Sequence, residues 1–165
     1  MEEKITIKPI GIIHTPYKDS KGISIQGKFD KNAEGQIEVL SEYAQGIKDV
    51  KGFSHIILIY YFDRAKEELL SGKPYLEDEP HGIFAIRSPM RPNHIGISIV
   101  KLEKIESNII TFSEVDMLDK TPLLDIKPYV SYFDSRENIR NGWLEKHFAD
   151  GKIPERTILK EKDNE

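Results

Sequence analysis

Short runs of β-branched and aromatic residues, separated by prolines, glycines and polar turns, constrain the fold of this chain more than any other feature. Such runs favour strands, whereas only one late stretch has the apolar spacing of a helix. Because strands and helices do not alternate regularly, the pattern argues for an antiparallel or mixed barrel and against a doubly wound sheet. We expect strands at residues 5–17, 36–40, 54–62, 83–86, 95–99, 109–115 and 124–129.

Two of these strands differ in the burial that their sequences predict. Residues 54–62 form the most apolar stretch of the chain, which predicts a central strand that is buried on both faces. Ile95, Ile97 and Ile99 instead alternate with other residues, as a half-buried strand requires.

Two helices are expected in addition to the strands. Ser41 is suited to cap the N-terminus of a short helix at 42–47. Residues 136–149 carry apolar side chains at roughly helical spacing, and Gly151 is suited to end that helix. The last dozen residues are charged, so we expect them to fray.

The length and composition of the chain fit a single globular domain. The chain has 165 residues, of which 38% are hydrophobic and 32% charged, so it can bury one hydrophobic core. We therefore predict a mainly β, single barrel-like domain with short helices. A C-terminal helix and a charged tail are expected at 136–165.

The composition also limits where the protein acts. Cysteine is absent, which removes disulfides and thiolate nucleophiles and fits a reducing compartment. No run of eighteen apolar residues is available for a transmembrane helix. The charged start, residues 1–4, lacks the apolar core of a secretory signal. These features predict a cytoplasmic protein without a membrane partner.

Several common cofactor and metal motifs are missing. No two glycines are separated by a single residue and there is no GK[ST] loop, which argues against a Rossmann-type or phosphate-loop site. The five histidines show no H-x-H, H-x-x-H or H-E-x-x-H spacing. We therefore expect no metal site.

Residues 87–96 read RSPMRPNHIG and form a stiff, basic stretch. Two arginines and an asparagine lie beside prolines, and a rigid loop places charged groups with little ordering cost. The planar guanidinium of arginine suits carboxylates and phosphates. The same stretch can equally be a proline-stiffened connection with solvated arginines.

Residues 116–129 read DMLDKTPLLDIKPY and carry three aspartates among apolar residues. Their irregular spacing differs from that of a plain solvated face, and carboxylates favour a nearby cationic group electrostatically. Alternatively, Asp116 and Asp125 cap turns by hydrogen bonding to their own backbone.

Together these two stretches resemble the signature of the TsaA-like (TrmO-like) family, whose best-known members methylate tRNA. The family pattern is similar to TRSP-x-RPNPIG followed by D-x-LDGTP-x-LDIKPY, and the chain reads IRSPMRPNHIG at 86–96 and DMLDKTPLLDIKPY at 116–129. Three further segments match in order and spacing, namely IGIIHTPY at 10–17, SIQG at 24–27 and GFSHIILIYYF at 52–62. The resemblance covers residues 5–135.

The resemblance implies a single barrel-like fold, a homodimer, and S-adenosylmethionine bound near the inter-subunit region. The implied reaction is methylation of the exocyclic nitrogen of threonylcarbamoyladenosine beside the tRNA anticodon. Carried over by position, cofactor contacts are implied for Ser24, Ile25, Gln26, Asp63, Arg64, Arg87, Ile97, Asp119, Lys120 and Thr121. Substrate contacts are implied for Arg91, Asn93, Asp125, Lys127 and Tyr129. No catalytic base is assigned.

The chain departs from the family pattern at four positions. Ile86, Asp63, His94 and Lys120 stand where threonine, histidine, proline and glycine are usual. A lysine at this last turn is harmless if its φ is negative, and strained by about 1 kcal/mol or more if its φ is positive.

Three functions are compatible with these features. The first is a tRNA methyltransferase, which needs a local basic track near Arg87, Arg91 and Lys127, because the net charge of −4 opposes bulk binding of nucleic acid. The second is a methyltransferase for a different acceptor, which the acidic charge favours. The third is a non-enzymatic module that binds S-adenosylmethionine, for which the substitutions at Asp63 and Lys120 leave room.

Overall fold

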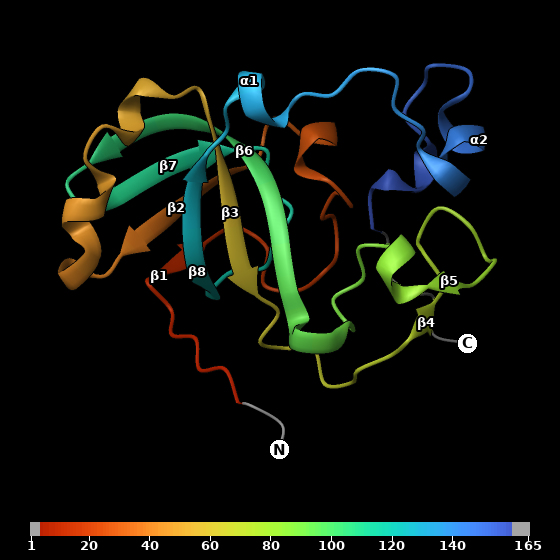
Figure 1. Cartoon of the computed structure of the whole chain (residues 1–165), viewed down its shortest axis with the longest axis horizontal. Coiled ribbons are helices and arrows are strands. Elements are labelled where there is room, and N and C mark those ends of the chain that lie inside the picture. The colour runs from red at the N-terminus through yellow and green to blue at the C-terminus, as the bar shows by residue number, and fades with distance from the viewer. Residues whose placement is uncertain (1–3, 160–165) are drawn as a thin grey trace.

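The computed structural model describes residues 4–159 and is built around a closed barrel (Figure 1). All neighbouring strands pair antiparallel, in the order β1-β2-β7-β6-β3-β8. The predicted mainly β, barrel-like fold is therefore confirmed. The strands are β1 (Gly11–His14), β2 (Glu34–Val39), β3 (His55–Tyr61), β6 (Ile95–Glu106), β7 (Ile109–Ser113) and β8 (Thr121–Pro128).

Shorter elements occupy the connections and the C-terminal part of the chain. The strands β4 (Ser71–Gly72) and β5 (His81–Gly82) form a separate two-stranded sheet, which lies beside the barrel in Figure 1. The α-helices are α1 (Ser131–Asp134) and α2 (Glu145–Phe148). The 3-10 helices are Gly27–Phe29, Ser41–Ile47, Val50–Gly52, Ile83–Ala85, Pro92–His94, Gly142–Leu144 and Glu155–Thr157. Across residues 4–159, none of the helices has the length and apolar character needed to cross a membrane.

Alternate residues of the barrel strands point inward and form the hydrophobic core. In β3, Ile56, Leu58 and Tyr60 are buried, while the residues between them are partly exposed. The prediction that residues 54–62 are buried on both faces is therefore wrong. The reason is that a closed barrel has one inner and one outer wall, so a strand fills the core with only every second side chain.

The half-buried character predicted for the start of β6 is confirmed, but the isoleucines form its outer face. Their exposed fractions are 40%, 50% and 48% for Ile95, Ile97 and Ile99. Ser98 and Val100 point inward instead and are buried. The rings of Tyr60 and Phe62 fill the space beside the start of this inner face, and a Cβ added to Gly96 would overlap the ring of Tyr60.

Three of the connections between barrel strands emerge at the same end of the barrel, which we call the loop end. They are residues 15–33, 62–94 and 114–120, here termed loops 1, 2 and 3. Because neighbouring strands are antiparallel, β1, β3 and β7 end where β2, β6 and β8 begin. Loops on a rigid scaffold commonly carry binding residues, so the loop end is the natural place for a site.

Two short segments differ from their prediction. Residues 83–86, predicted as a strand, contain the 3-10 helix Ile83–Ala85, in which Ile83 is buried and Phe84 is 75% exposed. A short apolar run does not by itself distinguish a strand from a turn. The predicted cap at Ser41 is also wrong, because the helix Ser41–Ile47 has Leu40 as its N-cap residue and no side-chain capping hydrogen bond.

The C-terminal helix is present but shorter than predicted. The helical spacing extends over 136–149, whereas α2 covers only Glu145–Phe148 after a 3-10 turn. Asn138 and Gly142 adopt positive φ values of 57° and 59°. Left-handed residues interrupt an α-helix, so a continuous helix cannot begin before Gly142.

Residues 154–159, which were expected to fray, are held against loop 1. Ile158 forms a β-bridge with Ser24, and the Ile25 amide donates to the Thr157 carbonyl oxygen at 2.8 Å. The predicted fraying is wrong for these residues because their backbone groups are paired. The remainder of the charged tail, 160–165, lies outside the described residues, as do residues 1–3.

Candidate functional site

The residues predicted to bind the cofactor gather at the loop end of the barrel, apart from one. The exception is Ile97, which lies on the outer face of β6. Segments that are far apart in the sequence therefore converge, as a shared site requires. Loop 1 provides Ser24, Ile25 and Gln26, loop 2 provides Asp63, Arg64 and Arg87, loop 3 provides Asp119 and Lys120, and Thr121 begins β8.

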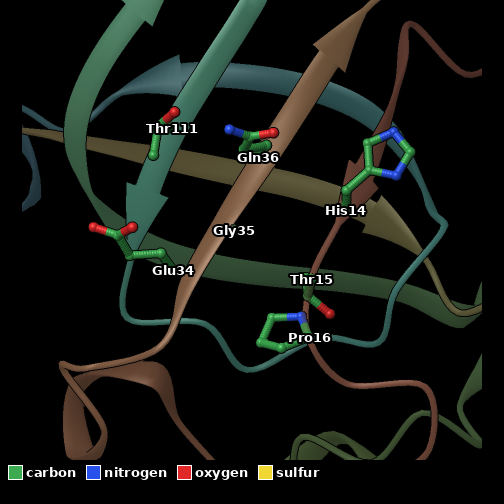
Figure 2. A pocket seen from close by; sticks show the side chains of 7 residues that line it. All are labelled: His14, Thr15, Pro16, Glu34, Gly35, Gln36 and Thr111. Carbon is green, nitrogen blue, oxygen red and sulfur yellow. The ribbon is translucent and has the colours of Figure 1, made fainter.

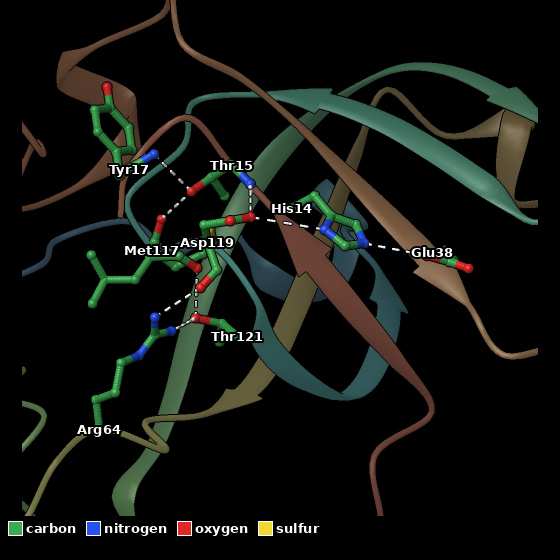
Figure 3. Close-up of polar contacts among 9 residues, drawn as sticks. His14, Thr15, Tyr17, Glu38, Arg64, Met117, Asp119 and Thr121 are labelled. Atoms are coloured by element: carbon green, nitrogen blue, oxygen red, sulfur yellow. Dashed lines mark hydrogen bonds and ion pairs between the residues drawn. The ribbon is translucent and has the colours of Figure 1, made fainter. Parts of the chain in front are cut away.

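Arg64 of loop 2 donates two hydrogen bonds to the turn between loop 3 and β8 (Figure 3). Its Nη1 donates to the carbonyl oxygen of Asp119 at 2.8 Å, and its Nη2 donates to Thr121 Oγ1 at 3.0 Å. The Thr121 hydroxyl in turn donates to the carbonyl oxygen of Leu118 at 2.7 Å. Three of the predicted cofactor residues are thus in direct contact.

His14 and Thr15, at the end of β1, join this cluster although neither was predicted as a contact residue. The Asp119 carboxylate accepts a hydrogen bond from the Thr15 amide at 3.1 Å and lies 3.8 Å from His14 Nδ1. The other ring nitrogen of His14 lies 3.3 Å from the Glu38 carboxylate (Figure 3). Their place in the matching segment at 10–17 is the sequence signal that could have found them.

A second cluster joins loop 1 to loop 2. Arg87 Nη1 donates to Gln26 Oε1 at 2.7 Å. The Ser24 hydroxyl, which is fully buried, donates to the Gln26 carbonyl oxygen at 2.7 Å. A guanidinium has five N–H donors, so Arg87 has further donors to offer to an anionic group.

Asp116 connects the barrel interior to loop 1. Its Oδ1 accepts a hydrogen bond from Ser98 Oγ at 2.5 Å, and its Oδ2 accepts one from the Gly27 amide at 3.0 Å. Burial raises the pKa of Asp116 to about 6, while these hydrogen bonds and the charge of Arg87 act in the opposite direction. The two contacts span the barrel and loop 1, so the spacing of aspartates in the sequence could not reveal them.

Two departures from the family pattern also lie at the loop end. Lys120 adopts a φ of 63°, a left-handed conformation that glycine tolerates and lysine does not favour. Asp63 Oδ1 lies 3.2 Å from Arg64 Nε. Asp63 is thus paired with Arg64, the arginine that also donates a hydrogen bond to Thr121 at the start of β8.

The residues predicted to bind substrate are not brought together. Arg91 and Asn93 lie in loop 2. Asp125 and Lys127 lie on the outer face of β8 and form an ion pair at 2.7 Å. Tyr129 follows β8 at the far end of that strand. A site at the loop end of one chain would include only the first two of these five residues.

A cavity of about 370 Å³ lies against β1, β2 and β7 (Figure 2). None of the predicted cofactor residues is among those that line it, so this cavity does not unite them. His14 lines the cavity and also contacts Asp119, which places the cavity next to the first cluster. The lining residues are His14, Thr15, Pro16, Glu34, Gly35, Gln36 and Thr111.

The groups at the loop end suit an organic ligand that carries charges of both signs. Arg87 offers donors for a carboxylate, whereas Asp63 and Asp119 offer oxygens for an ammonium group or for hydroxyls. Within residues 4–159, no group of three or more histidines, aspartates or glutamates is arranged to hold a metal ion.

Comparison with known proteins gives a family match over residues 12–135, to the model described as the tRNA-methyltransferase O N-terminal domain. A probable S-adenosyl-L-methionine-binding protein of Pyrococcus abyssi is 55% identical over 143 residues, which cover 87% of this chain and 78% of that protein. A mouse tRNA (adenine(37)-N6)-methyltransferase is 31% identical over 139 residues, which cover 80% of this chain and 32% of that protein.

The solved structures agree with the sequence match. The crystal structure of TrmO from Pseudomonas aeruginosa is similar with a TM-score of 0.73 and 33% identity, over 86% of this chain and 63% of that chain. The chain therefore spans less than two thirds of the length of this structural relative. The similarity confirms that the barrel fold is shared with that protein.

Proposed function

The chain belongs to the tRNA-methyltransferase O N-terminal domain family, and from this premise we propose that it is an S-adenosylmethionine-dependent methyltransferase that acts on tRNA. The proposed acceptor is the exocyclic nitrogen of threonylcarbamoyladenosine beside the anticodon. Two kinds of relative support the proposal, one named for binding S-adenosylmethionine and the other for methylating adenine 37 of tRNA.

The observation that carries this proposal is the convergence of the predicted cofactor residues at the loop end. S-adenosylmethionine has a carboxylate, an ammonium group, a sulfonium and ribose hydroxyls. Arg87 fits the carboxylate, and the carboxylates of Asp63 and Asp119 fit the ammonium group or the hydroxyls. The residues present therefore fit the charges of this cofactor.

In the proposed reaction the chain acts by binding and orienting. S-adenosylmethionine, when bound, supplies an electrophilic methyl group on its sulfonium. Arg87 is held by Gln26 and Asp119 by the Thr15 amide, so both charged groups are fixed before the ligand arrives. Methyl transfer depends mainly on positioning and charge complementarity, which such preorganised groups provide.

A second copy of the chain is part of the proposal. Ile97 points outward and is 50% exposed, so in a single chain it faces away from the barrel interior. It lies opposite Ile59 of β3, and Ile99 lies opposite Ile57, which produces an apolar outer wall. A homodimer through this wall would cover it and would place Ile97 beside a cofactor bound near the interface.

Contact with tRNA is proposed through local charge, because the chain as a whole has a net charge of −4. Arg87 and Arg91 supply positive charge at the loop end. Lys127 and Tyr129 lie toward the other end of β8. At the rise per residue of a strand, they are about 20–26 Å from Thr121, where β8 begins. A single small substrate group cannot reach all of these residues, whereas a nucleic acid that extends along β8 can. Such an acceptor also implies that the protein acts in the cytoplasm.

The proposal is tested by incubating the protein with methyl-labelled S-adenosylmethionine and bulk tRNA, followed by digestion to nucleosides. We expect the label in methylated threonylcarbamoyladenosine. A parallel reaction uses tRNA from cells that cannot make threonylcarbamoyladenosine, and we expect no label there. Arg87→Ala should lower the yield, while Lys51→Ala, an exposed change in the helix Val50–Gly52 between β2 and β3, serves as the matched control.

Other outcomes would contradict the proposal in different ways. Label in a different nucleoside, or only in a non-tRNA acceptor, would identify a methyltransferase of another specificity. Measurable binding of S-adenosylmethionine without transfer to any of these acceptors would favour a non-enzymatic binding module.

A further inference from the structure

A chain of hydrogen bonds runs from the barrel core to loop 1. The buried Tyr60 hydroxyl lies 3.0 Å from Ser98 Oγ, and Ser98 Oγ donates to Asp116 Oδ1 at 2.5 Å. Asp116 Oδ2 then accepts the Gly27 amide at 3.0 Å. Gly27 directly follows Ser24–Gln26, so the chain ends at the loop that holds the predicted cofactor residues.

We propose that Asp116 is a positioning residue, which fixes loop 1 and Arg87 in the arrangement that binds the cofactor. This inference rests on the proposed function, because it concerns how the same site is held. Asp116 is not among the residues predicted to contact the cofactor. It acts through the Gly27 amide and through the guanidinium of Arg87.

The anchoring of loop 1 depends on close contact as well as on this hydrogen bond. A Cβ added to Gly27 would overlap the carbonyl oxygen of Glu114, so loop 1 lies directly against the backbone of loop 3. At that contact the Asp116 carboxylate is the acceptor for the Gly27 amide. Without it, an amide at a buried contact would lack its partner, which is costly enough to displace the loop.

The charge of Asp116 also bears on Arg87. Arg87 acts to lower the pKa of Asp116, so the two groups are close enough to interact electrostatically. Arg87 in turn donates to the side chain of Gln26, the residue directly before Gly27. The Asp116 carboxylate thus acts on both parts of the site. It accepts a hydrogen bond from the backbone of loop 1 and attracts the arginine that loop 1 holds.

The surroundings of Asp116 define how it should respond to pH. The titratable and charged groups that face it are Tyr60 from β3 and Arg87 from loop 2. Burial raises the pKa of Tyr60, so this phenol stays neutral through the physiological range. Because the pKa of Asp116 is about 6, its negative charge is present above that pH and is lost below it.

The test is calorimetric binding of S-adenosylmethionine to the full chain from pH 5 to pH 8. We expect Asp116→Leu to weaken binding at pH 7.5 on the order of tenfold or more. Asp116→Asn keeps an acceptor for the Gly27 amide and should retain more affinity than the leucine variant. Wild-type affinity should fall as the pH drops through 6, and the asparagine variant should lack this step. Glu103→Gln, which alters another carboxylate that accepts from a serine hydroxyl, is the control and should bind as wild type does.

The rate of hydrogen exchange of the amides in residues 24–28 provides a second measurement of how firmly loop 1 is held, and it needs no ligand. We expect faster exchange in Asp116→Leu than in wild type, with thermal unfolding used to confirm that both are folded. If wild type binds and both Asp116 variants match its affinity and its pH profile, the inference is overturned while the proposed function stands. If wild type does not bind S-adenosylmethionine at all, both are overturned.

Discussion

At the scale of single residues, two of the three departures inside the signature motifs have left-handed backbone. Lys120 has a φ of 63° and His94 a φ of 49°. Proline fixes φ near −65°, so the proline usual in the family could not adopt the conformation seen at His94. The loop around residues 93–94 therefore differs locally from one built with that proline. Lys120 keeps a turn that suits the usual glycine.

Lys120→Gly should stabilise the protein. Removal of the side chain relieves the left-handed strain, and the greater backbone freedom of glycine in the unfolded chain offsets part of the gain. We expect the free energy of unfolding to rise by about 0.5–1 kcal/mol, measured by urea denaturation. Lys120→Val should have the opposite effect, because a β-branched residue disfavours positive φ more strongly. A less stable glycine variant would contradict this account of the turn.

Arg87→Ala should weaken the binding of S-adenosylmethionine on the order of tenfold to a hundredfold, the usual cost of losing a hydrogen bond to a charged group. The reason is that the guanidinium would contact the cofactor carboxylate, and its hydrogen bond to Gln26 Oε1 at 2.7 Å holds it in place. Gln26→Ala should show a smaller loss, because the arginine remains but is no longer fixed. Calorimetry at constant pH measures both. Unchanged affinity of the alanine variant at position 87 would show that the carried-over contact is absent.

At the scale of elements, sequence patterns identified most barrel strands but not the direction of their faces. The alternation of Ile95, Ile97 and Ile99 correctly indicated a strand. It could not indicate that the isoleucines face outward, because that depends on Tyr60 filling the barrel opposite Gly96. Residues 83–86 show a similar limit, since their apolar residues form a turn that buries Ile83 and Ile86 but exposes Phe84.

The close contact between loop 1 and loop 3 predicts that Gly27→Ala is disruptive. The added methyl group would overlap the carbonyl oxygen of Glu114, so one loop must move, at a cost of about 1–3 kcal/mol. Cofactor affinity should fall together with the melting temperature. Gly52→Ala is a matched control, because a Cβ there meets no atom within 4 Å. Equal stability of the two variants would refute the contact.

The C-terminal segment is held by a charged cluster around Glu77. This buried carboxylate accepts hydrogen bonds from His81 at 2.5 Å and from His147 and Lys146 at 2.6 Å. Trp143 stacks on His81 with a centroid distance of 4.8 Å. The cluster joins α2 to the strand β5, which explains why residues after 142 pack in place although their helix is only one turn long.

This cluster predicts an acid-dependent release of the C-terminal segment. Hydrogen bonds from Lys146, His81 and His147 lower the pKa of Glu77 to about 2 from an ordinary value of 4.5. A lowered pKa means that the stabilisation is complete above pH 4.5 and is lost as the pH falls toward 2. We expect the hydrogen-exchange protection of residues 142–159, relative to an unfolded chain at the same pH, to fall across this interval in wild type. Glu77→Gln should show low protection throughout, and Glu67→Gln, an exposed control, should follow wild type.

At the scale of the whole molecule, the barrel brings most of the motif residues to one end, and the contacts between them could not be predicted from the sequence. The matching segments at 24–27, 86–96 and 116–129 converge because the barrel is antiparallel, and a shared cofactor site there was implied only by the family resemblance. The contacts made by His14 and Asp116 arise between strands and loops that are distant in the chain. Spacing within a motif carries no information about such pairs, so they required the structure.

The apolar outer wall of β3 and β6 should determine the oligomeric state. Its paired isoleucines, Ile57 with Ile99 and Ile59 with Ile97, form a contiguous surface of the kind that soluble proteins bury against a partner. We expect the wild-type chain to elute as a dimer in size-exclusion chromatography with light scattering. Ile99→Glu should give a monomer, because a carboxylate at the centre of such a wall would lose its water on association. Ile12→Glu places the same change on the outer face of β1, where Ile12 is 38% exposed, and should leave the dimer intact.

A monomeric wild type, or a dimer that Ile12→Glu disrupts and Ile99→Glu does not, would mean that this wall is not the interface. The cofactor contact proposed for Ile97 would then have to be made within one chain.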